Sequence, residues 1–266
     1  MPTVLDKIVA VKRQEVARAR AERPLVELRA ALADAPPVRD YLAPLACNRP
    51  SAGGPIKLIA EVKKASPSAG LIRADFDAVE IAQTYAACGA SCLSVLTDEP
   101  HFQGSLAYLK AVRAAVDLPV LRKDFLIDEH QVVEARVAGA DAVLLIAECL
   151  TPAELADLHA LATDIGLTVL VELYEPANLP AVLACNPKLV GVNNRDLRTM
   201  TVDLEHCIRL REQVPSDVVF VGESGVKTHA DAQRLRAAGI DAMLVGESLM
   251  RQPDLPTAVK SLLGKD

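Results

Sequence analysis

The chain has 266 residues, of which 51% are hydrophobic and 24% are charged, and its formal net charge is −6 at pH 7. This composition excludes a disordered chain, and the acidic balance argues against a broad nucleic-acid surface, which requires clustered positive charge. Because aromatic residues make up only 3% and no Trp is present, we expect a core built from Val, Leu, Ile and Ala.

The N-terminal residues 1–24 mix both charge signs and lack the apolar centre of a secretory signal. The apolar stretches further along are shorter than a membrane span, so we expect no transmembrane helix. The six cysteines form no C-x-x-C pair, which indicates free thiols in a reducing cytoplasm and no zinc site. They are Cys47, Cys88, Cys92, Cys149, Cys185 and Cys207.

Residues 1–50 precede the first expected strand. The segment VLDKIVAVKRQEVARARA (4–21) predicts an amphipathic helix, and a Pro-rich connector follows it. This extension is too small to hold a core of its own. We therefore expect it to pack on the rest of the chain, within a single domain that spans residues 1–266.

Eight short apolar runs follow, with helical patterns between them. They are nearly continuous in Val, Leu and Ile, which is typical of parallel strands buried on both faces. The eight runs cover residues 57–62, 92–97, 118–125, 141–147, 168–173, 188–194, 218–224 and 241–248.

The segment 150–166 shows how clearly the intervening helices are delimited. Thr151 suits the N-cap, Pro152 the first helical position, and Glu154 completes a capping box. Gly166 suits the left-handed position after the last turn. Similar Gly-containing turns end other helices, and Gly139 and Gly239 lie 100 residues apart, which is consistent with an internally repeated half.

Eight strand–helix units in this length predict a (β/α)₈ TIM barrel in the α/β class, carrying the N-terminal helical extension. A doubly wound open sheet is the competing architecture. It commonly has fewer strands, and no G-x-G-x-x-G fingerprint follows the first strand here.

In such barrels the active site lies at the carboxyl ends of the strands. Glu61 and Lys63 point the same way because they are two apart on a strand. We expect burial and positive neighbours to lower the pKa of Lys123, making it a proton donor, and desolvation to raise the basicity of Glu172. Two alternatives stay open: structural ion pairs at the barrel mouth, and a Schiff-base lysine at Lys123.

Two further segments predict a phosphate site. GESGV (222–226) and GESLM (246–250) follow the last two strands, where backbone N–H groups and glycines bind anions in many barrels. Lys63 is placed to reach the same anion. The alternative is a pair of ordinary strand–helix turns with capping serines.

The motifs together resemble the indole-3-glycerol phosphate synthase family over about residues 56 to 251. The matching segments, in chain order, are IAEVKKASPSAG, LSVLTDEPHFQGS, PVLRKDFLIDEHQ, GADAVLLIA, VELYE, VGVNNRDL, VGESGV and LVGESLM. The resemblance implies a carboxy-lyase of tryptophan biosynthesis that needs no metal or organic cofactor. Its substrate would be 1-(2-carboxyphenylamino)-1-deoxyribulose 5-phosphate, an anionic phosphosugar–anthranilate compound.

The resemblance also implies a role for each polar candidate. Lys123 would be the general acid, Glu172 a general base, and Glu61 a helper in proton transfer during dehydration. The remaining residues would bind and orient the substrate: Lys63 at its anionic groups, Asn193 and Glu223 at the sugar hydroxyls and catalytic side chains, Arg195 at the anthranilate carboxylate, and Ser66, Ser224, Gly225, Gly246 and the Glu247 backbone at the phosphate.

The flat anthranilate ring requires an apolar slot. Phe102 and Phe125 follow the second and third strands, and with Pro67 and Leu144 they are the candidates for it. Ordinary loop packing is the alternative. Without Trp, an N-terminal Trp contact to substrate is missing, and the side-chain role of Glu247, where some relatives carry Ser, stays open.

Two other functions remain as alternatives at this point. One is another phosphosugar barrel enzyme, either an isomerase or a Schiff-base aldolase, and the other is a barrel that binds a phosphate metabolite without turnover. For any of these the expected partner is a small molecule rather than nucleic acid or a membrane. We expect a monomer or a weak homodimer.

Overall fold

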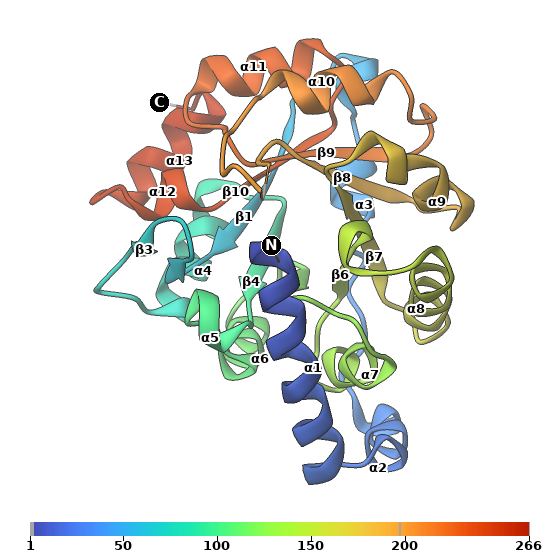
Figure 1. The fold of residues 1–266 in the computed structure, drawn as a ribbon. Coiled ribbons are helices and arrows are strands. Elements are labelled where there is room, and N and C mark those ends of the chain that lie inside the picture. The colour runs from blue at the N-terminus through green and yellow to red at the C-terminus, as the bar shows by residue number, and fades with distance from the viewer. Residues whose placement is uncertain (1–2, 197, 266) are drawn as a thin grey trace.

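A computed structural model describes residues 3–196 and 198–265 and shows a closed barrel of parallel strands surrounded by helices (Figure 1). Neighbouring strands follow the order β1-β10-β9-β8-β7-β6-β5-β4 around the barrel. All eight expected runs are barrel strands, so the predicted TIM barrel is confirmed and the open sheet is wrong. The strands are β1 (Lys57–Val62), β4 (Cys92–Leu96), β5 (Val120–Lys123), β6 (Ala142–Ile146), β7 (Thr168–Leu173), β8 (Leu189–Asn193), β9 (Val219–Glu223) and β10 (Ala242–Val245).

Helices alternate with these strands and cover the outside of the barrel. They are α4 (Ala78–Cys88), α5 (Glu99–Phe102), α6 (Leu106–Ala115), α7 (Glu129–Val137), α8 (Pro152–Asp164), α9 (Leu179–Ala184), α10 (Glu205–Arg211), α11 (His229–Ala237), α12 (Glu247–Met250) and α13 (Leu255–Leu263). The short strands β2 (Ala65–Ser66) and β3 (Gly70–Leu71) pair with each other after β1. Within the described residues, no helix is long and apolar enough to cross a membrane.

Helix α8 begins and ends where its sequence predicts. The Thr151 hydroxyl accepts from the Glu154 backbone N–H at 3.3 Å, and the Glu154 carboxylate accepts from the Thr151 N–H at 2.7 Å. This reciprocal capping box satisfies two N–H groups at the helix start. Gly166 has φ +86°, the left-handed conformation expected after the last turn.

Side chains on each barrel strand alternate between two cores. On β7, Val169 and Val171 pack outward against the helices, whereas Leu170 points into the barrel. The inward core also contains Ile59 and Leu121 and fills the barrel interior. Because the side-chain period of a strand is two, the inward set continues onto the polar residues at the strand ends.

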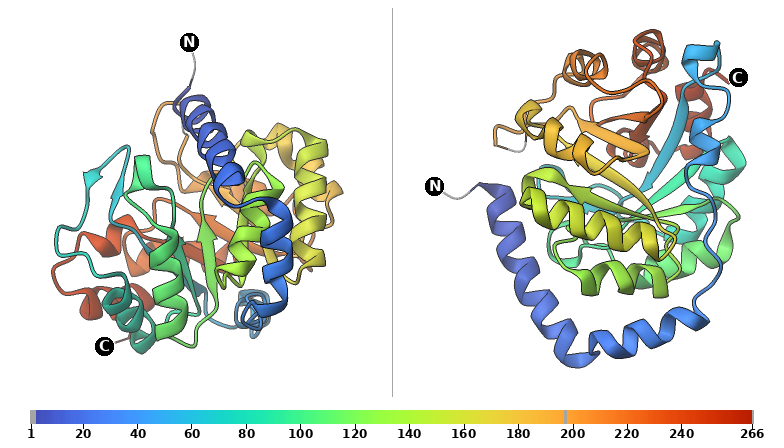
Figure 2. Two further views of the ribbon diagram at one scale, coloured as in Figure 1. Left: turned by 90° about the horizontal axis from the view of Figure 1, so that it is seen from below. Right: turned by 90° about the vertical axis from the view of Figure 1, so that its right-hand side faces the viewer.

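The N-terminal extension runs along the barrel from its mouth to its opposite end (Figure 2). Helix α1 (Val4–Glu22) confirms the expected amphipathic helix and is followed by α2 (Leu25–Ala30), while α3 (Ala43–Ala46) lies in the connector. Two connector side chains, Tyr41 and Leu45, are fully buried in the inward core. The connector therefore closes the amino-terminal end of the barrel, a role that its sequence did not suggest.

A local pattern recurs with a spacing of 100 residues. Asp141 accepts from the Val120 N–H, and Asp241 accepts from the Phe220 N–H, both at 2.9 Å. The repeated turn glycines, Gly139 and Gly239, both have positive φ. The same spacing relates Lys123 at the end of β5 to Glu223 at the end of β9, so both side chains reach the barrel mouth from equivalent positions.

Candidate active site

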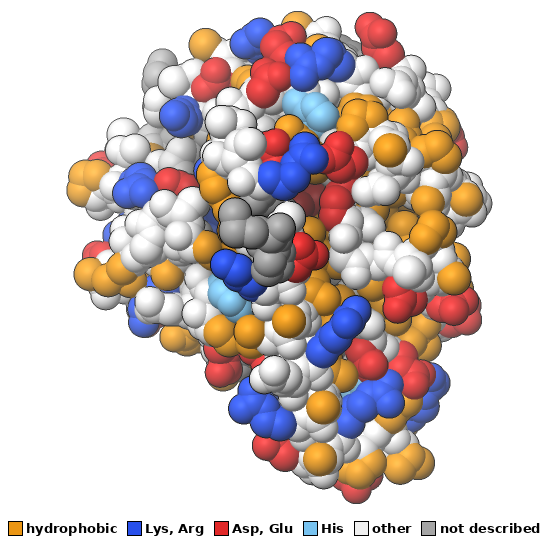
Figure 3. Space-filling view, viewed as in Figure 1, with side chains coloured by type: hydrophobic (Ala, Val, Ile, Leu, Met, Phe, Trp, Pro, Cys, Tyr) orange, Lys and Arg blue, Asp and Glu red, His pale blue; other side chains and the backbone are white. Residues whose placement is uncertain are grey.

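A cavity of about 860 Å³ opens at the carboxyl ends of the strands. Figure 3 shows acidic and basic side chains gathered around a hollow near the centre of this face. Every candidate residue of the sequence analysis lines this one cavity: Glu61, Lys63, Ser66, Pro67, Phe102, Lys123, Phe125, Leu144, Glu172, Asn193, Arg195, Glu223, Ser224, Gly225, Gly246 and Glu247.

The charged candidates meet because they occupy the last inward positions of their strands. Lys123 follows inward Leu121 on β5, Glu172 follows inward Leu170 on β7, and Glu223 ends β9. The strand register places Asn193 of β8 directly beside Glu223. Strand period and barrel closure together bring residues up to 100 positions apart into contact.

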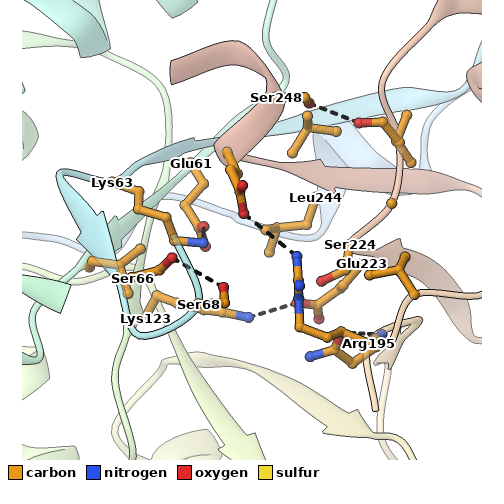
Figure 4. A pocket seen from close by; sticks show the side chains of 18 of the residues that line it. Glu61, Lys63, Ser66, Ser68, Lys123, Arg195, Glu223, Ser224, Leu244 and Ser248 are labelled. Atoms are coloured by element: carbon orange, nitrogen blue, oxygen red, sulfur yellow. Dashed lines mark hydrogen bonds and ion pairs between the residues drawn. The ribbon is translucent and has the colours of Figure 1, made fainter. Parts of the chain in front are cut away.

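Lys123 lies at the centre of this group. Its Nζ donates to Glu172 Oε2 at 2.8 Å and to Glu223 Oε2 at 2.6 Å, and the second of these contacts is visible in Figure 4. Asn193 Nδ2 donates to the other oxygen of Glu172 at 3.0 Å. Within residues 3–196 and 198–265, no group of three or more His, Cys, Asp or Glu is arranged to hold a metal ion. The cation shared by these two carboxylates is the Lys123 ammonium.

The electrostatic surroundings of Lys123 differ from the expectation. Positive neighbours were expected to lower its pKa, but its nearest charged groups are carboxylates, and Lys63 pairs instead with Glu61 at 2.6 Å. Burial alone would lower the pKa of Lys123, yet the charges of Glu172 and Glu223 outweigh burial and raise it above its usual value. The expected direction was therefore wrong, and the side chain is a cation held between two carboxyl groups.

The expectation for Glu172 is wrong for the same reason. Burial works to raise its pKa, but the Lys123 ammonium and the Asn193 amide outweigh burial and lower it. The partner carboxylate behaves oppositely: burial, followed by repulsion from Glu172, raises the pKa of Glu223 to about 8. Among the described residues, Glu223 Oε1 has no hydrogen-bond partner. The pair therefore divides into an ionised Glu172 and a Glu223 that holds its proton at neutral pH.

Gly191 makes room for this arrangement. It is an inward position of β8, between β7 and β9, and a Cβ there would collide with Glu223 Oε1 and approach Leu170 Cδ1 to 3.2 Å. We expect Gly191→Ala to displace Glu223 from Lys123. The kcat for product formation, measured in a steady-state assay at pH 7, should fall at least tenfold.

Gly222 provides a matched control on the neighbouring strand. A Cβ there would meet Leu235 at 3.3 Å and Cys207 at 3.4 Å, both outside the barrel. Gly222→Ala should therefore press on the outer core and not on Glu223, and we expect kcat to stay within about twofold of wild type. Equal kcat losses in the two variants would contradict a specific role for Gly191.

Glu61 and Lys63 form the second charged pair of the mouth. Glu61 is only 2% exposed and also accepts from Ser94 Oγ at 3.3 Å. Gly246 faces it, since a Cβ at Gly246 would lie 2.6 Å from Glu61 Oε1. The sequence assigned Gly246 to phosphate binding alone, but its missing side chain also provides the space that Glu61 occupies.

The predicted phosphate end lies beside the last two strands. Ser224 and Gly225 both have positive φ, +64° and +89°, which turns the chain sharply after β9. The Glu247 side chain, whose role the sequence left open, lies 3.6 Å from Arg195 and 3.0 Å from Arg251. It therefore pairs with arginines, which keeps part of its negative charge away from an incoming anion.

The apolar side of the cavity contains the expected aromatic pair. The Phe102 and Phe125 rings are 6.1 Å apart at 41°, and Leu144 lines the same cavity. Residues that the sequence did not assign also line it, among them Val4, Leu5 and Ile8 of α1. The apolar face of α1 was visible in the sequence, but nothing there indicated that this face borders the cavity.

Comparison with known proteins identifies close relatives over the whole chain. A family model described as indole-3-glycerol phosphate synthase matches residues 5–262. A protein of that name from Rhodopirellula baltica is 58% identical over 261 residues, covering 98% of this chain and 99% of the relative. Another of that name, from Polaromonas sp., is 50% identical and covers 100% of both chains.

Solved structures resemble the fold at much lower sequence identity. A crystal structure of 3-hexulose-6-phosphate synthase has a TM-score of 0.64 and 21% identity, covering 79% of this chain and 99% of that one. A second crystal structure of a 3-hexulose-6-phosphate synthase, from Salmonella typhimurium, has a TM-score of 0.65 and 13% identity, covering 79% of this chain and 97% of that one. These likenesses concern the barrel fold alone.

Proposed function

This chain belongs to the indole-3-glycerol phosphate synthase family, and from that premise we propose that the Lys123–Glu172–Glu223 cluster carries its chemistry. The observation that supports this most directly is the position of Lys123 Nζ, within 2.8 Å of both carboxylates at the barrel mouth. The proposed reaction is the decarboxylating, dehydrating ring closure of 1-(2-carboxyphenylamino)-1-deoxyribulose 5-phosphate, which makes the enzyme a carboxy-lyase.

The reaction requires two proton deliveries and one proton removal. The ring carbon that bears the carboxylate attacks the ketose carbon, and a proton goes to the ketose oxygen. CO₂ then leaves from that ring carbon with its bonding electrons left in the ring, which restores aromaticity. The new hydroxyl takes a second proton and leaves as water, and loss of a proton from the carbon next to nitrogen completes the indole.

Lys123 is the proposed general acid. It is cationic at neutral pH because the charges of the surrounding carboxylates, Glu172 first among them, outweigh its burial and raise its pKa, so it has a proton to give when the ketose oxygen develops negative charge. The same positive charge stabilises that oxygen, and more strongly than it would in bulk water because the Lys123 side chain is only 14% exposed. A proton transfer of this kind contributes about 10²- to 10⁴-fold to the rate.

Glu172 is the proposed general base, and Glu61 assists the dehydration. Glu172 is the ionised member of the carboxylate pair, and Asn193 fixes its orientation. Glu61 lies against the Lys63 ammonium at 2.6 Å, so this pair provides a second place where a proton moves. In this scheme Asn193 and Glu223 orient the sugar and the catalytic side chains.

The remaining lining residues fit the ends of the substrate. Arg195 is proposed to bind the anthranilate carboxylate, with Lys63 serving the anionic groups near it. Ser66, Ser224, Gly225, Gly246 and the Glu247 backbone are proposed to surround the phosphate. Pro67, Phe102, Phe125 and Leu144 are proposed to form the slot for the aromatic ring.

We also propose that the 266 residues form a single domain that works in the cytoplasm as a monomer or a weak homodimer. The contacts of the extension with the inward core support one domain. The six free cysteines support a reducing compartment.

The direct test is to supply the carboxyphenylamino-deoxyribulose phosphate and follow indole fluorescence. The background is low because the chain contains no Trp. We expect indole formation with one CO₂ released per turnover. Absence of both signals, from protein with normal circular dichroism, would contradict the proposal.

A further inference from the structure

Helix α1 carries a buried lysine that the chemistry above does not use. Lys12 is 3% exposed, and its Nζ lies 2.9 Å from Asp98 Oδ2, 2.9 Å from Asp124 Oδ1 and 2.7 Å from Glu15 Oε2. Asp98 and Asp124 are also buried, at 0% and 4% exposure. Burying a cation costs free energy, and here the two buried carboxylates that contact Lys12 offset that cost.

The first of these carboxylates holds a wall of the ring slot. Asp98 Oδ1 accepts from the His101 N–H at 2.9 Å and caps α5. Phe102 is the last residue of that one-turn helix. The position of the Phe102 ring therefore depends on where Asp98 is held.

The second carboxylate holds the adjoining part of the wall. Asp124 directly follows Lys123, and its Oδ1 accepts from the Phe125 N–H at 2.8 Å. Its Oδ2 accepts from the Thr97 hydroxyl, the residue next to Asp98. Lys12 thus joins the two loops whose Phe102 and Phe125 rings lie 6.1 Å apart.

The helix that supplies Lys12 also supplies part of the cavity lining. Leu5, Ile8 and Lys12 are three and four residues apart, which places them on one helical face. Leu5 and Ile8 line the cavity, and Lys12 is buried one turn further along. The ion cluster therefore fixes α1 at the place where its apolar residues border the cavity.

We propose that Lys12 is a positioning residue for the aromatic part of the substrate. Its ammonium neutralises Asp98 and Asp124, and through them it sets the spacing of Phe102 and Phe125 and the seating of α1. The inference rests on the proposed ring slot. Without Lys12, Asp98 would lose its lysine partner and Asp124 would keep only Arg122, 3.3 Å away, so the two buried carboxylates would repel each other and the two loops would separate.

The test compares Lys12→Met with the wild type. We expect the KM for the carboxyphenylamino-deoxyribulose phosphate to rise at least tenfold, while the inhibition constant of inorganic phosphate stays within about twofold. Adding Asp98→Asn to Lys12→Met removes one of the repelling charges and keeps an oxygen that can cap α5. The KM of this double variant should be at least threefold lower than that of Lys12→Met.

Arg49→Met is the structural control. Arg49 pairs with buried Asp241 at the other end of the barrel, at 2.6 Å, so its loss should lower the melting temperature without changing KM. If Lys12→Met also lowers the melting temperature but leaves KM unchanged, the inference is wrong. If Lys12→Met does not fold, the single variant Asp98→Asn provides the test. We expect its KM to be about threefold higher than that of the wild type. An unchanged KM in Asp98→Asn would overturn the inference.

Phe102→Ala separates this inference from the proposed slot. If that variant leaves KM unchanged, the ring slot itself is wrong. If it raises KM and the Lys12 variant does not, the slot stands and the positioning role of Lys12 is wrong.

Discussion

Replacing Lys123 with Met is expected to lower kcat for indole formation by about 10³- to 10⁴-fold, the upper range for a general acid. The variant loses the proton donor, and it also loses the cation that keeps Glu172 ionised. Single-turnover indole fluorescence measures the effect on chemistry apart from substrate binding.

Lys123→Arg is the matched variant for this experiment. Arginine keeps a positive charge between Glu172 and Glu223, so the folded state avoids an uncompensated buried charge on Glu172, a loss worth about 3–5 kcal/mol. Arginine does not release its proton in this pH range. We therefore expect Lys123→Arg to be folded and nearly inactive, and activity within tenfold of wild type would place the proton donor elsewhere.

The same residue tests the Schiff-base alternative. A nucleophilic lysine must be neutral, whereas the carboxylates around Lys123 outweigh its burial, raise its pKa and keep it charged. After treatment with borohydride in the presence of substrate, mass spectrometry should find Lys123 unmodified. A reduced adduct at this position would overturn its role as a general acid.

The fold and the composition of the site follow from short-range patterns in the sequence. The period of two along a strand predicted that Glu61 and Lys63 share a side, and the structure shows them 2.6 Å apart. The capping residues of α8 predicted its ends because caps act within four residues. Each site residue predicted from the family motifs lines the cavity, although its role stays a prediction.

Protonation could not be predicted in the same way. The pKa of Lys123 depends on carboxylates that are 49 and 100 residues away in sequence, and the directions expected for Lys123 and Glu172 were both wrong. Burial was foreseen at these positions, but the identity of the nearest charge was not. Lys12 was missed for a related reason, because a lysine on an amphipathic helix ordinarily faces water.

Replacing Glu172 with Gln is expected to lower kcat by about 10²- to 10³-fold, because the amide cannot accept a proton. Glutamine keeps the shape of the side chain, and its carbonyl oxygen can still accept from Lys123. Substrate binding should change little, so KM is expected to stay within about threefold in a steady-state assay at pH 7. A loss of less than tenfold in kcat would contradict the assignment of Glu172 as the base.

Glu223→Gln makes the comparison informative, because the two carboxylates contact the same Lys123 Nζ but differ in protonation. Burial raises the pKa of Glu223 to about 8, so at pH 7 it holds a proton and a neutral glutamine resembles it. We expect Glu223→Gln to lower kcat less than tenfold at pH 7. As pH rises through about 8, the wild type loses the Glu223 proton, while the variant has none to lose, so the wild-type rate should change there and the variant rate should not. If Glu223→Gln lowers kcat as much as Glu172→Gln at pH 7, the working base is Glu223. The ionised member of the pair is then Glu223, and Glu172 is the one that holds the proton.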